Sequence, residues 1–361
     1  MLLTISKRFE FSASRRLAVP AWSAEANRET FGRETDAAYG TGRNYAAVLV
    51  FGGSVDPRTG MVINVAEIKA AMRDLLAQRY DHRFLNEDTV LFDRVAPTPE
   101  NVAAQLLDDT VSLFAGAPAR PLACHVTESD GREATAYRDG TVEGHHWVEF
   151  SAARRTMSPH VSDAENRERF GIAAGDHGHH YRLRVTLRGE RDPMTGLCVP
   201  PPLVREALDA VHADLDHRHL NDQVLALAGR PTTTESLARW LHERLDVDLP
   251  VARVRLFERP DFFAEHDRDG ATWLGMQRTF DAAHRLHSPH LDDAENVAVY
   301  ERCNNPRGHG HTYRVEASLA APYDPRTGTA GDFVALRDGI DAAVAPWQDR
   351  HLDLETDDFT E

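Results

Sequence analysis

The 361-residue sequence has few cysteines, no long apolar run and fewer basic than acidic residues. Its cysteines, Cys124, Cys198 and Cys303, do not suffice for a disulfide framework, which favours a reducing cytoplasm. No apolar stretch is long enough to span a bilayer and there is no signal peptide, so we expect no membrane partner. The formal net charge of −16 argues against nucleic-acid binding, and an anionic ligand would need a local cluster of arginines.

Internal repetition is the strongest positive feature of the chain, with a period of roughly 130 residues, the size of a domain. Four kinds of segment recur: Phe11–Arg16, Phe150–Arg155 and Phe280–Arg285; Asp56–Gly60, Asp192–Gly196 and Asp324–Gly328; Asp81–Asn86 and Asp216–Asn221; Pro97–Asn101 and Thr232–Ser236. We therefore predict three domains, which we call repeat 1 (residues 1–140), repeat 2 (141–270) and repeat 3 (271–361).

Apolar spacing predicts the same elements in each repeat. The first strand of each repeat ends near the Phe-Ser-Ala-like segment. Second strands are predicted over Tyr45–Val50, Tyr181–Leu187 and Tyr313–Leu319, and first helices over Val65–Leu76, Leu203–Leu215 and Phe333–Val344. In repeats 1 and 2 we also predict second helices from near Pro99 and Thr234, and third strands that end at Glu128 and Glu258. The polar segments Gly131–Gly144 and Asp267–Gly270 are predicted to join the repeats. Repeat 3 stops where its second helix would begin, so its closing strands are either missing or supplied by another chain.

Repeat 3 carries the residues with the clearest chemistry. His309 and His311 are two residues apart in an alternating strand, so their side chains share one face. His284 lies in a neighbouring run that also reads as a strand, and two adjacent strands can bring three imidazoles to one zinc ion with an open fourth position. Cys303 precedes His309 by six residues, where a nearby cation would make its thiol a usable base.

Two other residue types are candidates for a site. The pairs Asp81-His82 and Asp216-His217 occupy matching positions, and a carboxylate can orient an imidazole and support its charged form. The alternative for these pairs is a structural role at the end of the first helix. Glu128 or Glu258 could accept two hydrogen bonds from a ligand, or each could be an ordinary strand end.

These motifs resemble the 6-pyruvoyl-tetrahydropterin synthase family. The residues that carry the resemblance are Phe280–Leu286, Asp293–Asn296, Cys303–His311, Tyr313 and Asp324–Gly328. The related 6-carboxy-tetrahydropterin synthases more often have a shorter spacing between the cysteine and the two histidines. The resemblance implies the tunnelling fold, of class α+β, in which each unit is an antiparallel sheet with two helices on one face and three units close a pseudo-trimeric barrel.

The resemblance also implies a reaction and its residues. The substrate is 7,8-dihydroneopterin triphosphate, and the enzyme is a phosphorus-oxygen lyase that releases triphosphate. Zinc is held by His284, His309 and His311, and Cys303 moves protons. An Asp-His pair, Asp81-His82 or Asp216-His217, supports the proton transfer from another repeat. A glutamate, Glu128 or Glu258, anchors the pterin.

The three repeats match these family positions unequally. Repeat 1 has Arg15, Thr41 and Arg43 at the places of the zinc ligands, and repeat 2 keeps His177 and His179 but has Arg154 as the third residue. A guanidinium cannot deprotonate, so zinc in repeat 2 is disfavoured. We expect one zinc per chain, with the arginines turned inward in place of the lost metal charge. Repeat 3 has Gln348-Asp349 instead of an Asp-His pair.

Two other functions stay open on the sequence alone. One is the 6-carboxy-tetrahydropterin synthase reaction of the queuosine pathway, a carbon-carbon cleavage with the same residues. The other is a non-catalytic pterin- or metal-binding homologue, which the loss of two zinc sites favours and the intact set in repeat 3 disfavours. Unpaired strand edges in repeat 3 predict a homo-oligomer.

Overall fold

The computed structural model describes residues 3–129 and 131–359, and these form two compact bodies. The first, which we call the N-terminal body, comprises residues 1–146 and 186–206, and the second, the C-terminal body, comprises 147–185 and 207–361. Repeat 2 therefore contributes to both bodies, and the strands β6 (Val142–Arg155) and β7 (Asp176–Leu187) have residues in each.

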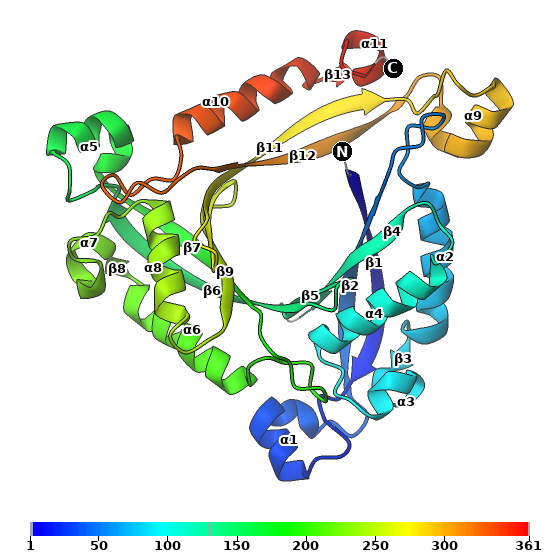
Figure 1. The fold of residues 1–361 in the computed structure, drawn as a ribbon, viewed down its shortest axis with the longest axis horizontal. Coiled ribbons are helices and arrows are strands. Elements are labelled where there is room, and N and C mark those ends of the chain that lie inside the picture. The colour runs from blue at the N-terminus through cyan, green and yellow to red at the C-terminus, as the bar shows by residue number, and fades with distance from the viewer. Residues whose placement is uncertain (1–2, 130, 360–361) are drawn as a thin grey trace. The chain divides into compact units, whose positions relative to one another are not determined.

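An antiparallel sheet with two helices on one face makes up most of the N-terminal body. The strand β1 (Leu3–Arg15) pairs with β2 (Thr41–Gly53), β2 with β4 (Arg120–Glu128), β4 with β5 (Glu133–Tyr137), and β5 with the start of β6. The helices α2 (Val65–Arg79) and α4 (Pro99–Leu113) cover this sheet (Figure 1). Their apolar stripes pack on alternate strand residues in one core that includes Phe11, Tyr45, Leu49, Met72 and Leu106.

The C-terminal body continues the same design with fewer elements in repeat 3. Its strands are hydrogen-bonded in the order β7, β9 (Val251–Arg259), β10 (Phe262–Asp267), β11 (Thr272–His284) and β12 (His309–Ala320). Repeat 2 provides the helices α6 (Pro201–Leu215), which begins in the N-terminal body, and α8 (Thr234–Leu245), and repeat 3 provides α10 (Phe333–Val344). α10 packs on β11 and β12 through Ile340 and Val344.

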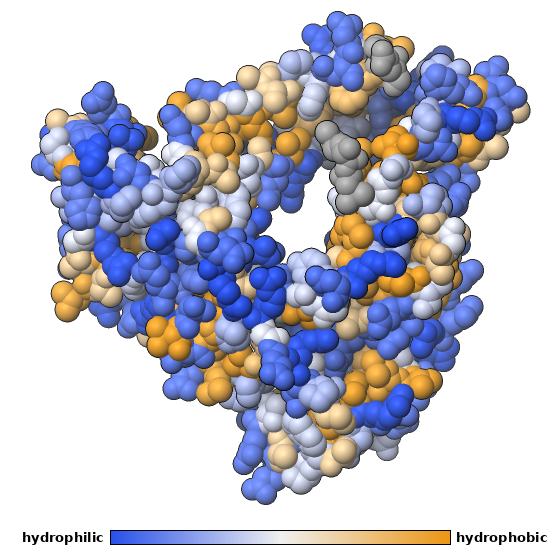
Figure 2. Space-filling view, in the orientation of Figure 1, coloured by the Kyte–Doolittle hydropathy of each residue, from blue (hydrophilic) through white to orange (hydrophobic). Residues whose placement is uncertain are grey.

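Short elements complete each repeat. In each repeat a helix of eight residues follows the first strand. These helices are α1 (Ala24–Phe31), α5 (Asp163–Phe170) and α9 (Asp293–Tyr300). Figure 2 shows mostly hydrophilic residues over α5, in keeping with its sequence DAENRERF. The remaining short strands and helices are β3 (Arg83–Phe84), β8 (Arg218–His219), β13 (Arg350–His351), α3 (Leu85–Asp88), α7 (Leu220–Gln223) and α11 (Leu352–Glu355).

The predicted strands and helices are confirmed, with two corrections. Gly131–Gly144 is more than a polar join, because β5 occupies Glu133–Tyr137 and β6 begins at Val142. The loops after the first strands contain α1, α5 and α9, which were not predicted because each has only eight residues and α1 and α5 are mostly polar. The sheet is not closed among the described residues, so the pseudo-trimeric barrel stays a prediction. No described helix has the length and apolarity needed to cross a bilayer.

The recurring Asp-Pro-x-Thr-Gly turn docks on the start of a helix from the preceding repeat. In the N-terminal body, Thr98 caps α4 and its hydroxyl donates to the carbonyl of Thr195 at 2.7 Å. In the C-terminal body, Thr233 caps α8 and its hydroxyl donates to the carbonyl of Gly328. The same pair of motifs therefore joins repeat 1 to repeat 2 and repeat 2 to repeat 3.

The docked turn should tolerate less change than its undocked counterpart. Gly328 and Gly60 both have left-handed φ angles, 78° and 67°. A Cβ at Gly328 would lie 2.3 Å from Pro231, whereas one at Gly60 meets no described atom within 4 Å. We expect Gly60→Ala to cost about 1–2 kcal/mol from backbone strain, and Gly328→Ala to cost about 1–3 kcal/mol more from overpacking. Thermal unfolding of the two variants tests this, and equal shifts in the transition temperature would contradict the docking.

Candidate metal centre and its counterparts

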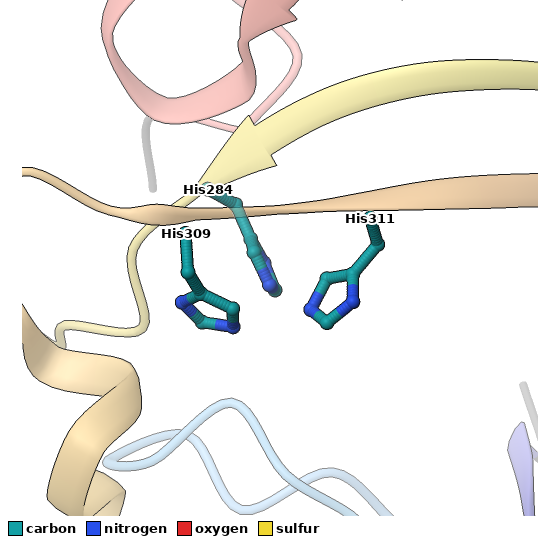
Figure 3. A group of neighbouring side chains, drawn as sticks. All are labelled: His284, His309 and His311. Carbon is teal, nitrogen blue, oxygen red and sulfur yellow. The ribbon is translucent and has the colours of Figure 1, made fainter.

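Three histidines converge at the end of β11 and β12 in repeat 3. Antiparallel pairing sets His284 opposite His309 and Ala282 opposite His311, so the strand register alone brings the three together. Their ring centroids are 4.6, 4.9 and 5.3 Å apart, and one nitrogen from each lies within 4.8 Å of the others. Figure 3 shows the three rings pointing into a common space.

The histidine cluster fits a metal ion. Nε2 of His284 and Nδ1 of His309 are buried without a hydrogen-bond partner among the described residues, and an unpaired buried nitrogen is costly. Burial, followed by the neighbouring His309 and His311, lowers the pKa of His284, which favours the neutral imidazole that ligates metals. Three imidazoles with an open fourth position form a donor set suited to catalytic zinc.

Cys303 lies in the short 3-10 turn Glu301–Asn304, directly after α9. Its carbonyl accepts a hydrogen bond from the backbone N–H of Leu286 at 2.9 Å, which ties this turn to the chain just beyond His284. The thiol is partly exposed. Glu301 has a positive φ of 47°, where repeats 1 and 2 have Gly32 and Gly171. A non-glycine residue in this conformation is strained, and such strain tends to occur at functional sites.

Repeat 1 fills the equivalent place with an ion-pair network. Arg15 and Glu128 are fully buried, and both oxygens of Glu128 accept hydrogen bonds from Arg15. Glu34 contacts the same guanidinium at 2.6 Å and also pairs with Arg43 and Arg132. Although burial alone lowers the pKa of Arg15, its bonds to Glu128 raise it above the usual value. Arg15 thus points inward as predicted, and the carboxylate of Glu128 is already paired.

Repeat 2 combines features of both other repeats. One ligand atom each from His177, His179 and Glu258 lies within 4.8 Å of the others, a grouping that the sequence did not reveal. However, Arg154 is buried and donates to Glu258 at 2.5 Å, and Nε2 of His179 lies 3.0 Å from the same carboxylate. Burial favours a higher pKa for Glu258, but Arg154 and His179 outweigh it and lower the pKa. The guanidinium therefore neutralises the carboxylate that a metal would need.

In both Asp-His pairs the carboxylate contacts the imidazole and also accepts a hydrogen bond from the backbone of a neighbouring strand. Oδ1 of Asp81 accepts from the N–H of Ser12 at 2.9 Å, and its Oδ2 lies 2.9 Å from Nδ1 of His82. Asp216 and His217 repeat this geometry with Ser151, at 2.8 and 2.5 Å. The hydrogen bond from Ser12, more than the contact with His82, lowers the pKa of Asp81. Both histidine side chains are more than four-fifths exposed and could reach a ligand.

Two buried carboxylates were not predicted from the sequence. Glu100 and Glu235 occupy the second position of α4 and α8, and burial raises the pKa of each to about 7. Oε2 of Glu100 has no hydrogen-bond partner among the described residues. The recurrence of Pro97–Asn101 as Thr232–Ser236 was the available signal, since both segments place a glutamate at the same point.

The fold is of class α+β, and three imidazoles converge at the ends of two paired strands. The model of the family described as 6-pyruvoyl tetrahydropterin synthase matches residues 4–139, 145–269 and 274–361. The chain therefore belongs to the 6-pyruvoyl tetrahydropterin synthase family.

Individual relatives cover parts of the chain. The 6-pyruvoyl tetrahydrobiopterin synthase of Drosophila melanogaster is 44% identical over 85 residues, which are 24% of this chain and 50% of that protein. The human protein of the same name is 40% identical over 105 residues, 29% of this chain and 72% of its own length. The solved structure of Caenorhabditis elegans 6-pyruvoyl tetrahydropterin synthase is 31% identical, covering 35% of this chain and 95% of its own, with a TM-score of 0.34.

The metal content of the purified protein tests the assignment of the centre. We predict about one zinc ion per chain, because one repeat offers three imidazoles without an arginine beside them. His309→Ala should abolish this zinc, whereas His177→Ala should leave it unchanged. Metal analysis after gel filtration gives the stoichiometry, and about two or three zinc ions per chain would contradict the prediction.

Restoring the lost ligand in repeat 2 tests the role of Arg154. Arg154→His supplies a third imidazole beside His177 and His179 and frees Glu258, so zinc content should rise by about one per chain. Arg15→His is the matched control, because repeat 1 has no other histidine at these positions. No gain in zinc for a folded Arg154→His protein would show that the pocket of repeat 2 has lost its metal-binding geometry.

Proposed function

We propose that the protein is a zinc-dependent lyase that acts on 7,8-dihydroneopterin triphosphate with loss of triphosphate. The observation that carries this proposal is the convergence of His284, His309 and His311 beside the turn that holds Cys303. Family membership and the names of the relatives support it. A soluble cytoplasmic enzyme is consistent with the composition of the chain.

The residues of this chain would divide the chemistry between them. Bound zinc would acidify the side-chain hydroxyls of the substrate. Cys303 would take the adjacent carbon-bound proton, and the electrons left behind would expel the triphosphate. Repeat 3 has no Asp-His pair, because Gln348 and Asp349 stand there. Asp81-His82 or Asp216-His217 would therefore supply the exposed imidazole that moves protons.

The candidate pterin anchors, Glu128 and Glu258, already have charged partners. Glu128 is fully buried against Arg15, and Glu258 is held by Arg154 and His179. Either carboxylate could accept two hydrogen bonds from a pterin only after exchange of these partners. Glu258 is the better candidate, because its side chain is 13% exposed and that of Glu128 is 0% exposed.

A carbon-carbon cleavage is the second candidate reaction. A relative in Pyrococcus furiosus named dihydroneopterin monophosphate aldolase is 33% identical over 93 residues, 75% of its length. The 6-carboxy-tetrahydropterin synthase reaction of the queuosine pathway is a cleavage of the same kind. Incubating zinc-loaded protein with dihydroneopterin triphosphate and identifying the pterin product by mass spectrometry separates elimination from cleavage. Absence of any product would favour a non-catalytic pterin-binding homologue.

We also propose that the protein acts as a homo-oligomer in which three repeats complete a pseudo-trimeric barrel. β12 is the last strand in the pairing order of the C-terminal body, and its outer edge pairs with no described strand. Unpaired edges favour association with another chain. Light scattering at micromolar concentration tests this, and a monomer mass throughout would contradict it.

The Asp-His pairs can be tested separately from the metal. One of His82→Asn and His217→Asn should lower turnover by about a hundredfold or more, because a general acid-base group is lost. Asparagine is chosen because both histidines have positive φ angles, 56° and 55°, which asparagine tolerates. Zinc content should stay normal in both variants. Full activity in both would exclude the shared site and redirect attention to Asp349 and His351.

A further inference from the structure

An open depression in the N-terminal body lies where β1, β2 and β3 meet. Ser12, Ser14, Asn44, Arg43, His82 and Arg83 line it together with small and apolar neighbours. None of the lining residues is acidic, although the chain as a whole carries a formal charge of −16. Because arginine and histidine line the depression and carboxylates do not, an anion would be repelled less there than elsewhere on this acidic protein.

Arg83 is the main source of uncompensated charge in this depression. Arg43 is paired with Glu34 at 3.1 Å, and His82 is paired with Asp81 at 2.9 Å. The guanidinium of Arg83 donates a hydrogen bond to the carbonyl of Gln78 at 3.3 Å, and no carboxylate among the described residues pairs with it. The positive charge of Arg83 is therefore not neutralised by a described carboxylate, and most of its N–H donors remain available to a ligand.

Neutral donors surround this charge. The hydroxyl of Ser12 lies 3.0 Å from Oδ1 of Asn44 and donates to it, which orients the amide. The hydroxyl of Ser14 has no hydrogen-bond partner among the described residues. Because Asp81 accepts from Nδ1 of His82, the other ring nitrogen is available to an incoming group. Hydroxyl, amide, imidazole and guanidinium groups together are the usual partners of phosphate oxygens.

The other repeats do not reproduce this surface. In repeat 3, Asp281 and Asp349 replace Ser12 and His82, and Arg350 is paired with Glu355 at 3.3 Å. In repeat 2, His180 stands in place of Asn44 and is paired with Glu149 at 3.2 Å. Asp176 lies 3.1 Å from His219, the counterpart of Phe84. These carboxylates disfavour an anion, so the feature is specific to repeat 1.

We propose that the depression of repeat 1 binds a phosphoanion, with Arg83 as its principal charged contact. The ligand is either the triphosphate chain of the substrate, which rests on the proposed function, or a free inorganic polyphosphate. Both sources share the same recognition chemistry. If the ligand is the triphosphate chain of the substrate, His82 would lie beside the departing phosphate chain.

Calorimetric titration with inorganic tripolyphosphate tests the site without requiring turnover. The wild-type protein should bind it with an affinity that falls as salt is added. Arg83→Ala should weaken binding by about tenfold or more, the loss expected for a charged hydrogen bond, and Arg83→Lys should restore part of it. The matched variant Arg218→Ala in repeat 2 should bind as the wild type does. Equal affinities of Arg83→Ala and wild type, or an equal loss in Arg218→Ala, would overturn the proposal.

Two further measurements exclude a metal-bound anion and identify the source. His309→Ala, which should lack zinc, must still bind tripolyphosphate, because loss there would place the anion on the metal and overturn the site. For the substrate, Arg83→Ala should raise KM for dihydroneopterin triphosphate by about tenfold while kcat is kept. If KM is unchanged although tripolyphosphate binding is lost, the site stands and its ligand is a free polyphosphate.

Discussion

The pairing of buried charges at the ends of the first two strands is the constraint on which this region of repeats 1 and 2 depends. At the ends of β11 and β12 three imidazoles leave room for a cation, and at the ends of β1 and β2 a guanidinium provides one. Repeat 2 has two imidazoles and a guanidinium around one carboxylate. Buried charges persist only when they are paired. Repeats 1 and 2 therefore neutralise the carboxylate at this position by different combinations of side chains, whereas repeat 3 has three imidazoles there.

The docking of turns on helix starts explains why three diverged repeats keep one architecture. Thr98 and Thr233 cap their own helices and also bind the turn of the following repeat. The cap and the joint thus use the same side chain, so neither can change without the other. The backbone conformation at the Asp-His position is also the same in all three repeats. His82, His217 and Asp349 all have positive φ angles, although repeat 3 has an aspartate where the other two have a histidine.

Local pattern was enough to predict most elements, whereas the partners of buried charges were not predictable. Alternating apolar residues gave β2, β7 and β12, and helical spacing gave α2, α6 and α10, because burial of one face fixes their period. The histidine cluster followed from the spacing of His309 and His311 and the strand register. Glu258 near His177 and His179 could not be foreseen, because 79 or more residues of sequence separate strands that pair only in the fold. β5 was missed because its sequence, EATAY, has only five residues and its buried positions are the small alanines Ala134 and Ala136.

The internal pairing of Arg15 with Glu128 has a consequence for how such a chain can change over generations. A pocket that neutralises its own carboxylate is held together without a metal, so its folding does not depend on metal supply. A metal pocket is filtered by both folding and ligand geometry. Repeats fused in one polypeptide can then accumulate mutations at unequal rates. On the proposed function, repeat 3 carries the added constraint of ligand geometry, whereas the arginine-containing pockets of repeats 1 and 2 need only keep their charges paired.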